Sequence, residues 1–251
     1  MSFKLLHLDI ETRPGSAYIW SLRKQKISVD QIIEPTSLLC FAMKWHGKAK
    51  IIFKKSTWAV GSAYTDMVKT AHELLSEADA VCHFNGISFD MKRLNQEFLL
   101  QKLPPVPEIP NIDLKVEVMN NFDLLSSRLA FVAPILGLGE KIKNDGWPLW
   151  RGCMAGDEAS WRKMRSYNIQ DVRLMPRLYE ELLPWIKKHP NMNLFNKTRA
   201  NCTHCGSYKV QQRGYVYRTT LTYLRYQCQT CGHWFQSRAC VKGTQPKVEV
   251  R

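Results

Sequence analysis

The sequence predicts a mixed α/β domain followed by a small β module. Hydrophobic segments typical of strands occupy residues 3–11, 37–45 and 48–55. Residues 64–79 then carry apolar side chains at helical spacing. Strands that come first and then alternate with helices predict a mixed sheet that is covered by helices.

The later elements continue this alternation. We expect a short buried strand at 80–84, a helix at 90–103 that ends before the prolines of PPVP, and a strand at 111–119. Residues 123–188 read as mostly helical. The first three strands are expected to form an antiparallel meander.

Composition describes a globular chain of 251 residues, 45% of them hydrophobic, which is enough to bury a sizeable core. No apolar run reaches about 18 residues, and the first residues lack the features of a secretory signal, so we expect a cytoplasmic protein with no membrane segment. Of eight cysteines, four are scattered and four form two close pairs. Reduced thiols and a metal site fit this pattern better than a disulfide framework.

The formal net charge of +14 is concentrated near the C-terminus. Residues 197–251 contain ten Lys/Arg and one acid, whereas residues 1–196 contain 26 Lys/Arg and 21 acids. Such a basic piece predicts an anionic partner. The alternative is a solvated tail that serves solubility.

Asp9 and Glu11 interrupt the hydrophobic stretch LLHLDIET. Residues two apart on a strand point to the same face, so the two carboxylates project together while Leu8 and Ile10 point into the packed side. Buried together, they need a compensating cation, either Lys/Arg or a divalent metal. An exposed edge strand with solvated acids is the alternative.

Two later segments place further acids in suggestive positions. Asp90 follows a buried strand and a turn and begins the predicted helix, where it serves either a site or only the helix dipole. Tyr167 and Asp171 are four residues apart, which puts them on one face of a helix.

Together, DIET at 9–12, NGISFD at 85–90 and YNIQD at 167–171 resemble the three exonuclease motifs of the DEDD superfamily, which have a ribonuclease H-like fold. The Tyr-x-x-x-Asp form resembles the tyrosine branch (DEDDy), which includes the proofreading domains of family B DNA polymerases. Residues 17–47 are also similar to stand-alone, phage-type exonucleases. The resemblance covers roughly residues 4–188 and implies a bacterial or phage-infected cytoplasm.

The resemblance implies a two-metal active site. Tyr167 would orient the attacking water, and Asn85 and Phe89 would hold the terminal nucleotide, although Phe89 could instead pack in the core. Asp113 would be structural or would support the site. The ligands of two Mg²⁺ or Mn²⁺ ions would be Asp9, Glu11, Asp90 and Asp171.

Two C-x₂-C-G segments, CTHCG and CQTCG, predict one structural Zn²⁺. Each is followed by a glycine, Gly206 or Gly232, which permits the tight turn of such a knuckle. His204 and His233 could replace a thiolate, but four cysteines already complete a tetrahedral shell. The predicted ligands are Cys202, Cys205, Cys228 and Cys231.

The segment around these cysteines resembles a zinc ribbon of the kind found in transposases and transcription-type DNA-binding proteins. Tyrosines alternate there with Arg213, Arg218 and Arg225, a composition suited to phosphates and stacked bases. One face of the hairpin is expected to pack and the other to bind nucleic acid. The expected domains are 1–190 (catalytic), 191–200 (linker), 201–240 (ribbon) and 241–251 (basic tail).

These features predict a ribonuclease H-like α/β fold with a zinc ribbon, acting as a 3′–5′ exonuclease on single-stranded or frayed DNA. The alternatives are a 3′–5′ exoribonuclease and a non-catalytic nucleic-acid-binding or recruitment factor that uses the ribbon. The expected partners are nucleic acid and replication or recombination proteins.

Overall fold

The computed structural model describes residues 3–23, 26–195 and 201–242. The chain divides into two compact units, one of residues 4–178 and one of residues 1–3 and 179–251. The predicted domain boundaries stay predictions. Most of the predicted basic tail and half of the predicted linker lie outside the described residues.

The larger unit is built on a five-stranded sheet in the order β5-β4-β1-β6-β7. β1 pairs antiparallel with β4 and parallel with β6. β5 pairs antiparallel with β4, and β7 pairs parallel with β6. The predicted mixed sheet and meander of β1, β4 and β5 are therefore confirmed. The strands are β1 (Leu5–Arg13), β4 (Ser37–Trp45), β5 (Ile51–Lys55), β6 (Ala80–His83) and β7 (Asn111–Asp113).

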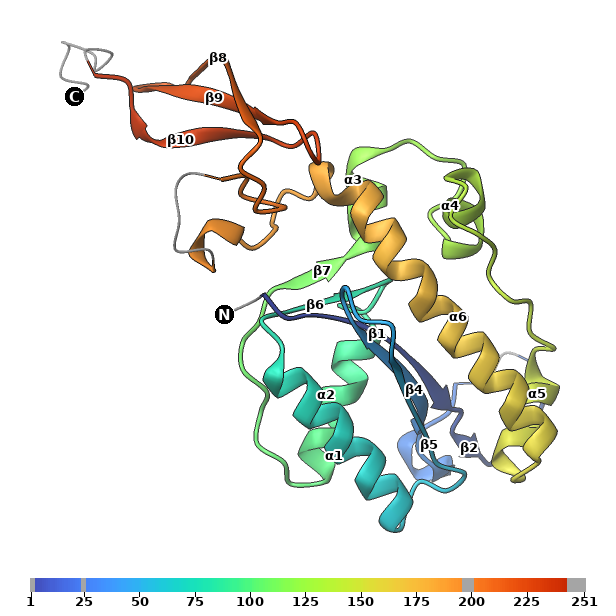
Figure 1. The fold of residues 1–251 in the computed structure, drawn as a ribbon. Helices are drawn as coiled ribbons and strands as arrows, with labels where there is room; N and C mark the ends of the chain where they lie inside the picture. The colour runs from blue at the N-terminus through green and yellow to red at the C-terminus, as the bar shows by residue number, and fades with distance from the viewer. Residues whose placement is uncertain (1–2, 24–25, 196–200, 243–251) are drawn as a thin grey trace. The chain divides into compact units, whose positions relative to one another are not determined.

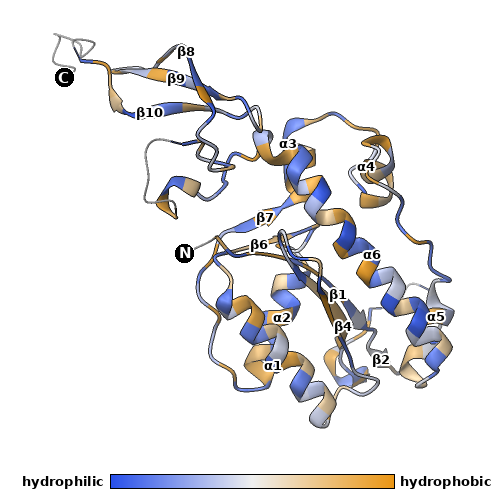
Figure 2. Cartoon of the chain, in the orientation of Figure 1, coloured by the Kyte–Doolittle hydropathy of each residue, from blue (hydrophilic) through white to orange (hydrophobic). Residues whose placement is uncertain are grey.

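Helices cover both faces of this sheet (Figure 1). Leu6, Leu8 and Ile10 of β1 join a core with α1 and α2, whereas Leu39 and Cys40 of β4 join a core with α5 and α6. Figure 2 shows hydrophobic residues along β4 and β6, with hydrophobic and hydrophilic residues mixed along the helices. The helices are α1 (Ser62–Glu77), α2 (Asp90–Leu100), α3 (Leu114–Asn121), α4 (Leu129–Ile135), α5 (Trp147–Met154) and α6 (Glu158–Leu182).

Short elements complete the two units. A two-stranded ribbon follows β1 before the chain enters β4. No helix of the described residues is long and apolar enough to cross a membrane. The short elements are β2 (Ser16–Ala17), β3 (Ile32–Glu34) and the 3₁₀ turns η1 (Val29–Gln31), η2 (Leu183–Trp185) and η3 (Met192–Leu194).

The predicted strand at 111–119 is wrong beyond its third residue. Only Asn111–Asp113 pairs in the sheet, and the chain then turns into α3. The Asp113 carboxylate accepts hydrogen bonds from the backbone N–H groups of Lys115 and Val116, which caps the helix. This cap overrides the alternating pattern of the sequence.

The smaller unit contains a three-stranded antiparallel sheet in the order β10-β9-β8. β8 and β9 form the hairpin that the sequence predicts between the two cysteine pairs. Among residues 201–242, only Cys202, His204 and Cys228 are buried. The strands are β8 (Val210–Tyr217), β9 (Thr222–Cys228) and β10 (Trp234–Cys240).

Candidate active site and zinc site

Three carboxylates meet on the face of the large sheet that α6 covers. β1 carries Asp9 and Glu11, and α6 supplies Asp171 from far along the chain. One ligand atom of each residue lies within 4.8 Å of the others. One oxygen of Asp171, Oδ1, is buried and has no hydrogen-bond partner among the described residues. An all-oxygen group with such an atom fits a hard divalent cation.

Asp90, at the start of α2, is hydrogen-bonded to the main chain of β1, the strand that carries Asp9 and Glu11. Its Oδ1 atom accepts a hydrogen bond of 3.1 Å from the backbone N–H of Ile10, the residue between Asp9 and Glu11. The side chain is 4% exposed and stands at the start of α2. Asp90 is not part of the group of three within 4.8 Å, but its charge raises the pKa of Asp9 and of Glu11.

Burial raises the pKa of every acid in the site, and repulsion by the neighbouring acids adds to the rise for Asp9 and Glu11. Burial is the larger cause, and the charge of Asp171 adds to it for Asp9 and for Glu11, whose pKa rises to about 8. Burial raises the pKa of Asp90 to about 7, against the hydrogen bond from Ile10. Because of these raised pKa values, some of the carboxyl groups hold a proton at neutral pH. A divalent cation that binds to the group would displace these protons.

Lys141 supplies the counter-charge within this site. Its Nζ lies 2.7 Å from Asp171 Oδ2 and 4.7 Å from the centroid of the Tyr167 ring. The buried acids predict a compensating cation, but no motif of the sequence identified Lys141 as that cation. The signal available was its place directly after LGLGE, inside the segment that resembles the exonuclease family.

Tyr167 and Asn168 complete the site from α6. Tyr167 is 8% exposed and contacts Trp150 edge to face, with 6.4 Å between ring centroids. Its pKa is raised by burial, while the interaction with Lys141 opposes the shift, so its hydroxyl is protonated at neutral pH. Asn168, which sequence reasoning missed although it lies within YNIQD, donates from Nδ2 to the Oδ2 and backbone oxygens of Asp9, at 2.5 and 3.2 Å.

The turn that precedes Asp90 is held by Asp113. Its two carboxylate oxygens accept hydrogen bonds from the backbone N–H groups of Asn85 (2.8 Å) and Ile87 (3.2 Å). The side chain of Asn85 accepts from Lys115 Nζ at 3.0 Å. Phe89 is 41% exposed, so the alternative in which it packs in the core is wrong.

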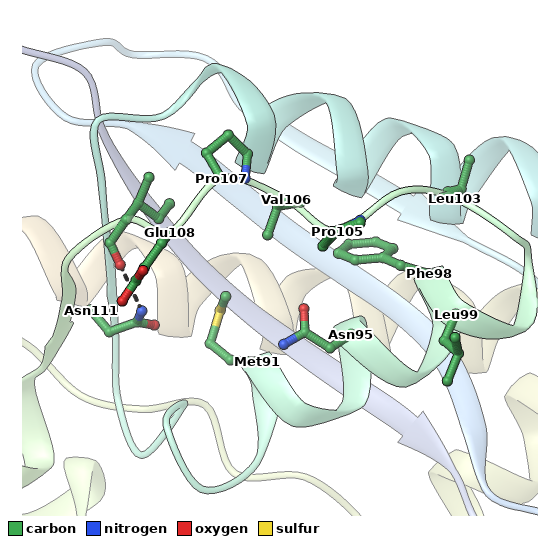
Figure 3. Close-up of a pocket in the computed structure, with 11 residues that line it drawn as sticks. Met91, Asn95, Phe98, Leu99, Leu103, Pro105, Val106, Pro107, Glu108 and Asn111 are labelled. Atoms are coloured by element: carbon green, nitrogen blue, oxygen red, sulfur yellow. Dashed lines mark hydrogen bonds between the residues drawn. The ribbon is translucent and has the colours of Figure 1, made fainter.

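The cavity in Figure 3, about 420 Å³, is separate from these acids. α2 and the segment that follows it line the cavity, with Met91 and Phe98 among the residues drawn. Both residues belong to the core that packs on Leu8 and Ile10. Because Asp9 and Glu11 point to the other face of β1, this cavity is not part of the acidic site.

The four predicted zinc ligands lie together in the smaller unit. Their sulfur atoms are within 4.8 Å of one another, and two pairs, Cys202 with Cys231 and Cys205 with Cys228, are 3.6 Å apart. Zinc–sulfur bonds of about 2.3 Å in a tetrahedron require sulfur separations close to this distance. The donor set therefore fits one Zn²⁺.

The backbone around the cysteines has the conformation of zinc knuckles. Gly206 and Gly232 have φ of 72° and 80°, a region that favours glycine. Backbone N–H groups of Thr230 and Cys231 donate to the Cys228 sulfur, which lowers the pKa of that thiol to about 7 although burial acts to raise it.

The two histidines near the knuckles have other roles. His204 Nε2 pairs with the backbone oxygen of Ile186 at 2.7 Å, and His233 Nδ1 pairs with that of Pro184 at 3.0 Å. Their rings stack on each other. Neither histidine belongs to the group of four ligands.

Of the three predicted arginines, two lie together. Arg218 donates two hydrogen bonds to Gln236 Oε1. Arg225 of β9 stacks over Trp234 of the neighbouring strand β10. Arg213 contributes its backbone oxygen, which accepts from Arg225 Nε at 2.8 Å. The structure thus brings Arg218 and Arg225 to one cavity and places Arg213 beside it through its main chain.

The family model of the RNase H superfamily (RNase_H_2) matches residues 36–183, more than half of the chain. The chain therefore belongs to the RNase H superfamily. The matched residues include Asp90, Tyr167 and Asp171, whereas β1 with Asp9 and Glu11 lies before them.

Among solved structures, the chain is similar to the family B DNA polymerase from the hyperthermophilic archaeon Pyrobaculum calidifontis, with a TM-score of 0.54 and 17% identity. The similarity covers 73% of this chain and 25% of the polymerase chain. At this identity the likeness shows a shared fold. No curated protein matches the sequence.

Proposed function

We propose that the protein is a two-metal-ion 3′–5′ exonuclease of the DEDDy type that acts on DNA with an unpaired 3′ end. The observation that carries this proposal is the group of Asp9, Glu11 and Asp171, with Asp90 hydrogen-bonded to the same strand. The order and spacing of the three motifs, and membership of the RNase H superfamily, support it.

The four acids would hold two Mg²⁺ or Mn²⁺ ions. When bound, such ions activate water as a nucleophile at neutral pH and neutralise the charge that develops on the departing 3′-oxygen. Asp9 would serve both ions. Glu11 and Asp171 would hold the one on the side of the attacking water, and Asp90 would support the other.

The neighbouring side chains would position these ligands and the water. Asn168 fixes the Asp9 carboxylate through its hydrogen bonds, and Lys141 fixes Asp171. Tyr167 keeps its proton at neutral pH, so its role is to orient the water through a hydrogen bond and not to act as the base. Asn85 and the exposed ring of Phe89 are proposed to contact the terminal nucleotide.

The ribbon is proposed to hold the nucleic acid. No Asp or Glu occurs between Glu181 and Glu249, so the ribbon's cations face no acid of their own segment. A zinc ion held by four cysteines would stabilise such a fold, and the arginines of the ribbon, with the aromatic side chains of one of its faces, are suited to phosphates and bases.

The test measures cleavage of oligonucleotides labelled at the 3′ or the 5′ end, as DNA and as RNA. The zinc-loaded chain is assayed with Mg²⁺, with Mn²⁺ and with neither, because a strong chelator would also strip the ribbon. We expect shortening from the 3′ end that requires the divalent ion, faster on DNA than on RNA.

The matched variants are Asp9→Asn and Asp66→Asn. Asp9→Asn should abolish shortening, whereas Asp66, an exposed acid of α1 paired with Lys54, should be replaceable without effect. Cleavage that survives Asp9→Asn, or that begins internally or at the 5′ end, would overturn the proposal. Binding without any shortening would identify the non-catalytic factor, and faster shortening of RNA would identify an exoribonuclease.

A further inference from the structure

The strand register of the ribbon sorts its side chains onto two faces. Trp234 is opposite Gln227 and Gln236 is opposite Arg225, so these four side chains share one face of the β9–β10 pair. Arg218 follows β8 and reaches the same face, where its Nε and Nη2 atoms donate to Gln236 Oε1 at 3.2 and 2.9 Å. We call this the arginine face.

The opposite face has a different chemistry. Tyr226 and Phe235, which pair across β9 and β10, stack with 5.6 Å between ring centroids. Tyr215 and Tyr217 of β8 lie 6.4 Å apart on the same side. This tyrosine face has aromatic rings but lacks the paired arginines.

A cavity of about 380 Å³ borders the arginine face, and its lining also includes Phe235 from the neighbouring part of β10. Trp234, which is 48% exposed, lines it together with Arg218, Arg225 and Gln236. The guanidinium carbon of Arg225 lies 5.3 Å from the centroid of the Trp234 ring. The half-exposed indole of Trp234 thus lies beside polar side chains that are already oriented by hydrogen bonds.

The charge of the arginine face indicates that its ligand is an anion. The described part of the ribbon, residues 201–242, carries cations and no Asp or Glu, so an anion meets no repulsion there. Guanidinium groups recognise phosphate oxygens, and an indole face stacks on a base. A base can reach the indole only when it is unstacked, which excludes the interior of a duplex.

We propose that the arginine face binds single-stranded nucleic acid, with one base stacked on Trp234 and the flanking phosphates on Arg218 and Arg225. The inference rests on the proposed function of the ribbon and assigns it a face, a strandedness and a stacking residue. It does not depend on cleavage by the acidic site.

The test measures binding of a fluorescent oligothymidylate by the full zinc-loaded chain, by anisotropy without Mg²⁺. Trp234→Ala should weaken binding about tenfold, the usual effect of one lost stacking contact. Arg218→Gln and Arg225→Gln should each weaken binding and lower the slope of log affinity against log salt by about one. Trp234→Phe should restore most of the affinity.

The matched control is Tyr217→Ala, which removes an aromatic side chain that is 78% exposed on the tyrosine face. Its affinity should equal that of the unaltered chain. On a strand with abasic sites, Trp234→Ala should make no difference, because no base is left to stack. Zinc content and thermal unfolding of each variant establish that the ribbon is intact.

Three outcomes would overturn the inference: unchanged binding by Trp234→Ala, an equal loss with Tyr217→Ala, or an equal loss for duplex and single strand. If only the exonuclease proposal is wrong, the chain should bind the single strand normally, Trp234→Ala should still weaken this binding, and the strand should not be shortened.

Discussion

The acidic group on β1 and α6 and the four cysteines of the ribbon are both suited to metal, but they are assembled over different distances in the chain. Asn168 meets Asp9 across 159 residues, whereas Cys202 and Cys205 are three apart. The acids stand on a sheet with a large core on both faces. Among residues 201–242 of the ribbon, only Cys202, His204 and Cys228 are buried.

Because of this difference, we expect only the zinc ion to be needed for folding. A carboxylate group fixed by a packed strand and helix keeps its geometry without an ion, at the cost of raised pKa values. A module with so small a core depends on its metal for folding. We therefore expect loss of the divalent ions to stop chemistry, and loss of zinc to unfold the ribbon.

The largest expected effect is that of Cys202→Ser. Structural zinc contributes about 10 kcal/mol or more to such modules, so the ribbon should lose zinc and unfold. Residues 4–178 should stay folded, and cleavage of short oligonucleotides at saturation should continue while their binding weakens. Zinc content, limited proteolysis and the cleavage assay measure these three results.

Cys240→Ser is the matched control, because Cys240 also lies in the ribbon but outside the group of four ligands. It should keep zinc and resist protease like the unaltered chain. A Cys202→Ser chain that retains a protease-resistant ribbon would show that the fold does not need the metal.

Tyr167→Phe tests the acidic site with a smaller change. Removal of the hydroxyl should lower the rate about tenfold, the equivalent of one hydrogen bond of about 1.4 kcal/mol. The Mg²⁺ concentration needed for half-maximal rate should not change, because Tyr167 is not a proposed ligand. Tyr18→Phe, at an exposed position, is the control, and a loss above a thousandfold would instead indicate a proton-transfer role.

Lys141→Met removes the counter-charge of Asp171. The pKa of Asp171 should rise further, so the acid limb of the pH–rate profile should move to higher pH while the rate at high pH changes less. Lys54→Met, which breaks an exposed ion pair, should leave the profile in place. A uniform loss at every pH would mean that Lys141 acts on the transition state.

The smallest expected effect is the change of folding stability with pH, which should differ between the two units. Glu11 has a folded pKa of about 8, above its ordinary value of 4.5, so the folded state binds the extra proton between these values. Without Mg²⁺, the larger unit should become more stable as pH falls from 8 to 6.5. Thermal unfolding should show this gain, and Glu11→Gln should reduce it.

The smaller unit, which contains the ribbon, should respond in the opposite sense. Burial lowers the pKa of His189 to about 4 and that of His204 to about 3, so these rings stay neutral when folded and take up protons when unfolded. Stability from these residues is present above pH 6.5 and is lost as pH falls toward 4. Hydrogen exchange of the β9 amides, corrected for intrinsic rates, should show less protection at pH 5 than at pH 7. Equal protection at the two pH values would contradict this prediction.

Local features of the sequence were enough to predict much of the architecture. The predicted strand at 37–45 coincides with β4, and the two cysteine pairs meet with their glycines in the expected turns. These predictions succeed because hydrophobic alternation and a three-residue spacing are properties of neighbouring residues. The strand expected at 111–119 failed because one capping carboxylate, Asp113, outweighed the alternating pattern.

The chemical groups of this protein can be predicted from its sequence: four acids and a tyrosine in ordered motifs, four thiolates and a basic, aromatic C-terminal segment. The pairing of Lys141 with Asp171, the hydrogen bond of Asn168 to Asp9, and the shared face of Arg225 and Trp234 are known only from the folded structure. These contacts join residues from different elements, and their distances are set by the packing and strand register of the whole fold, which no local pattern encodes.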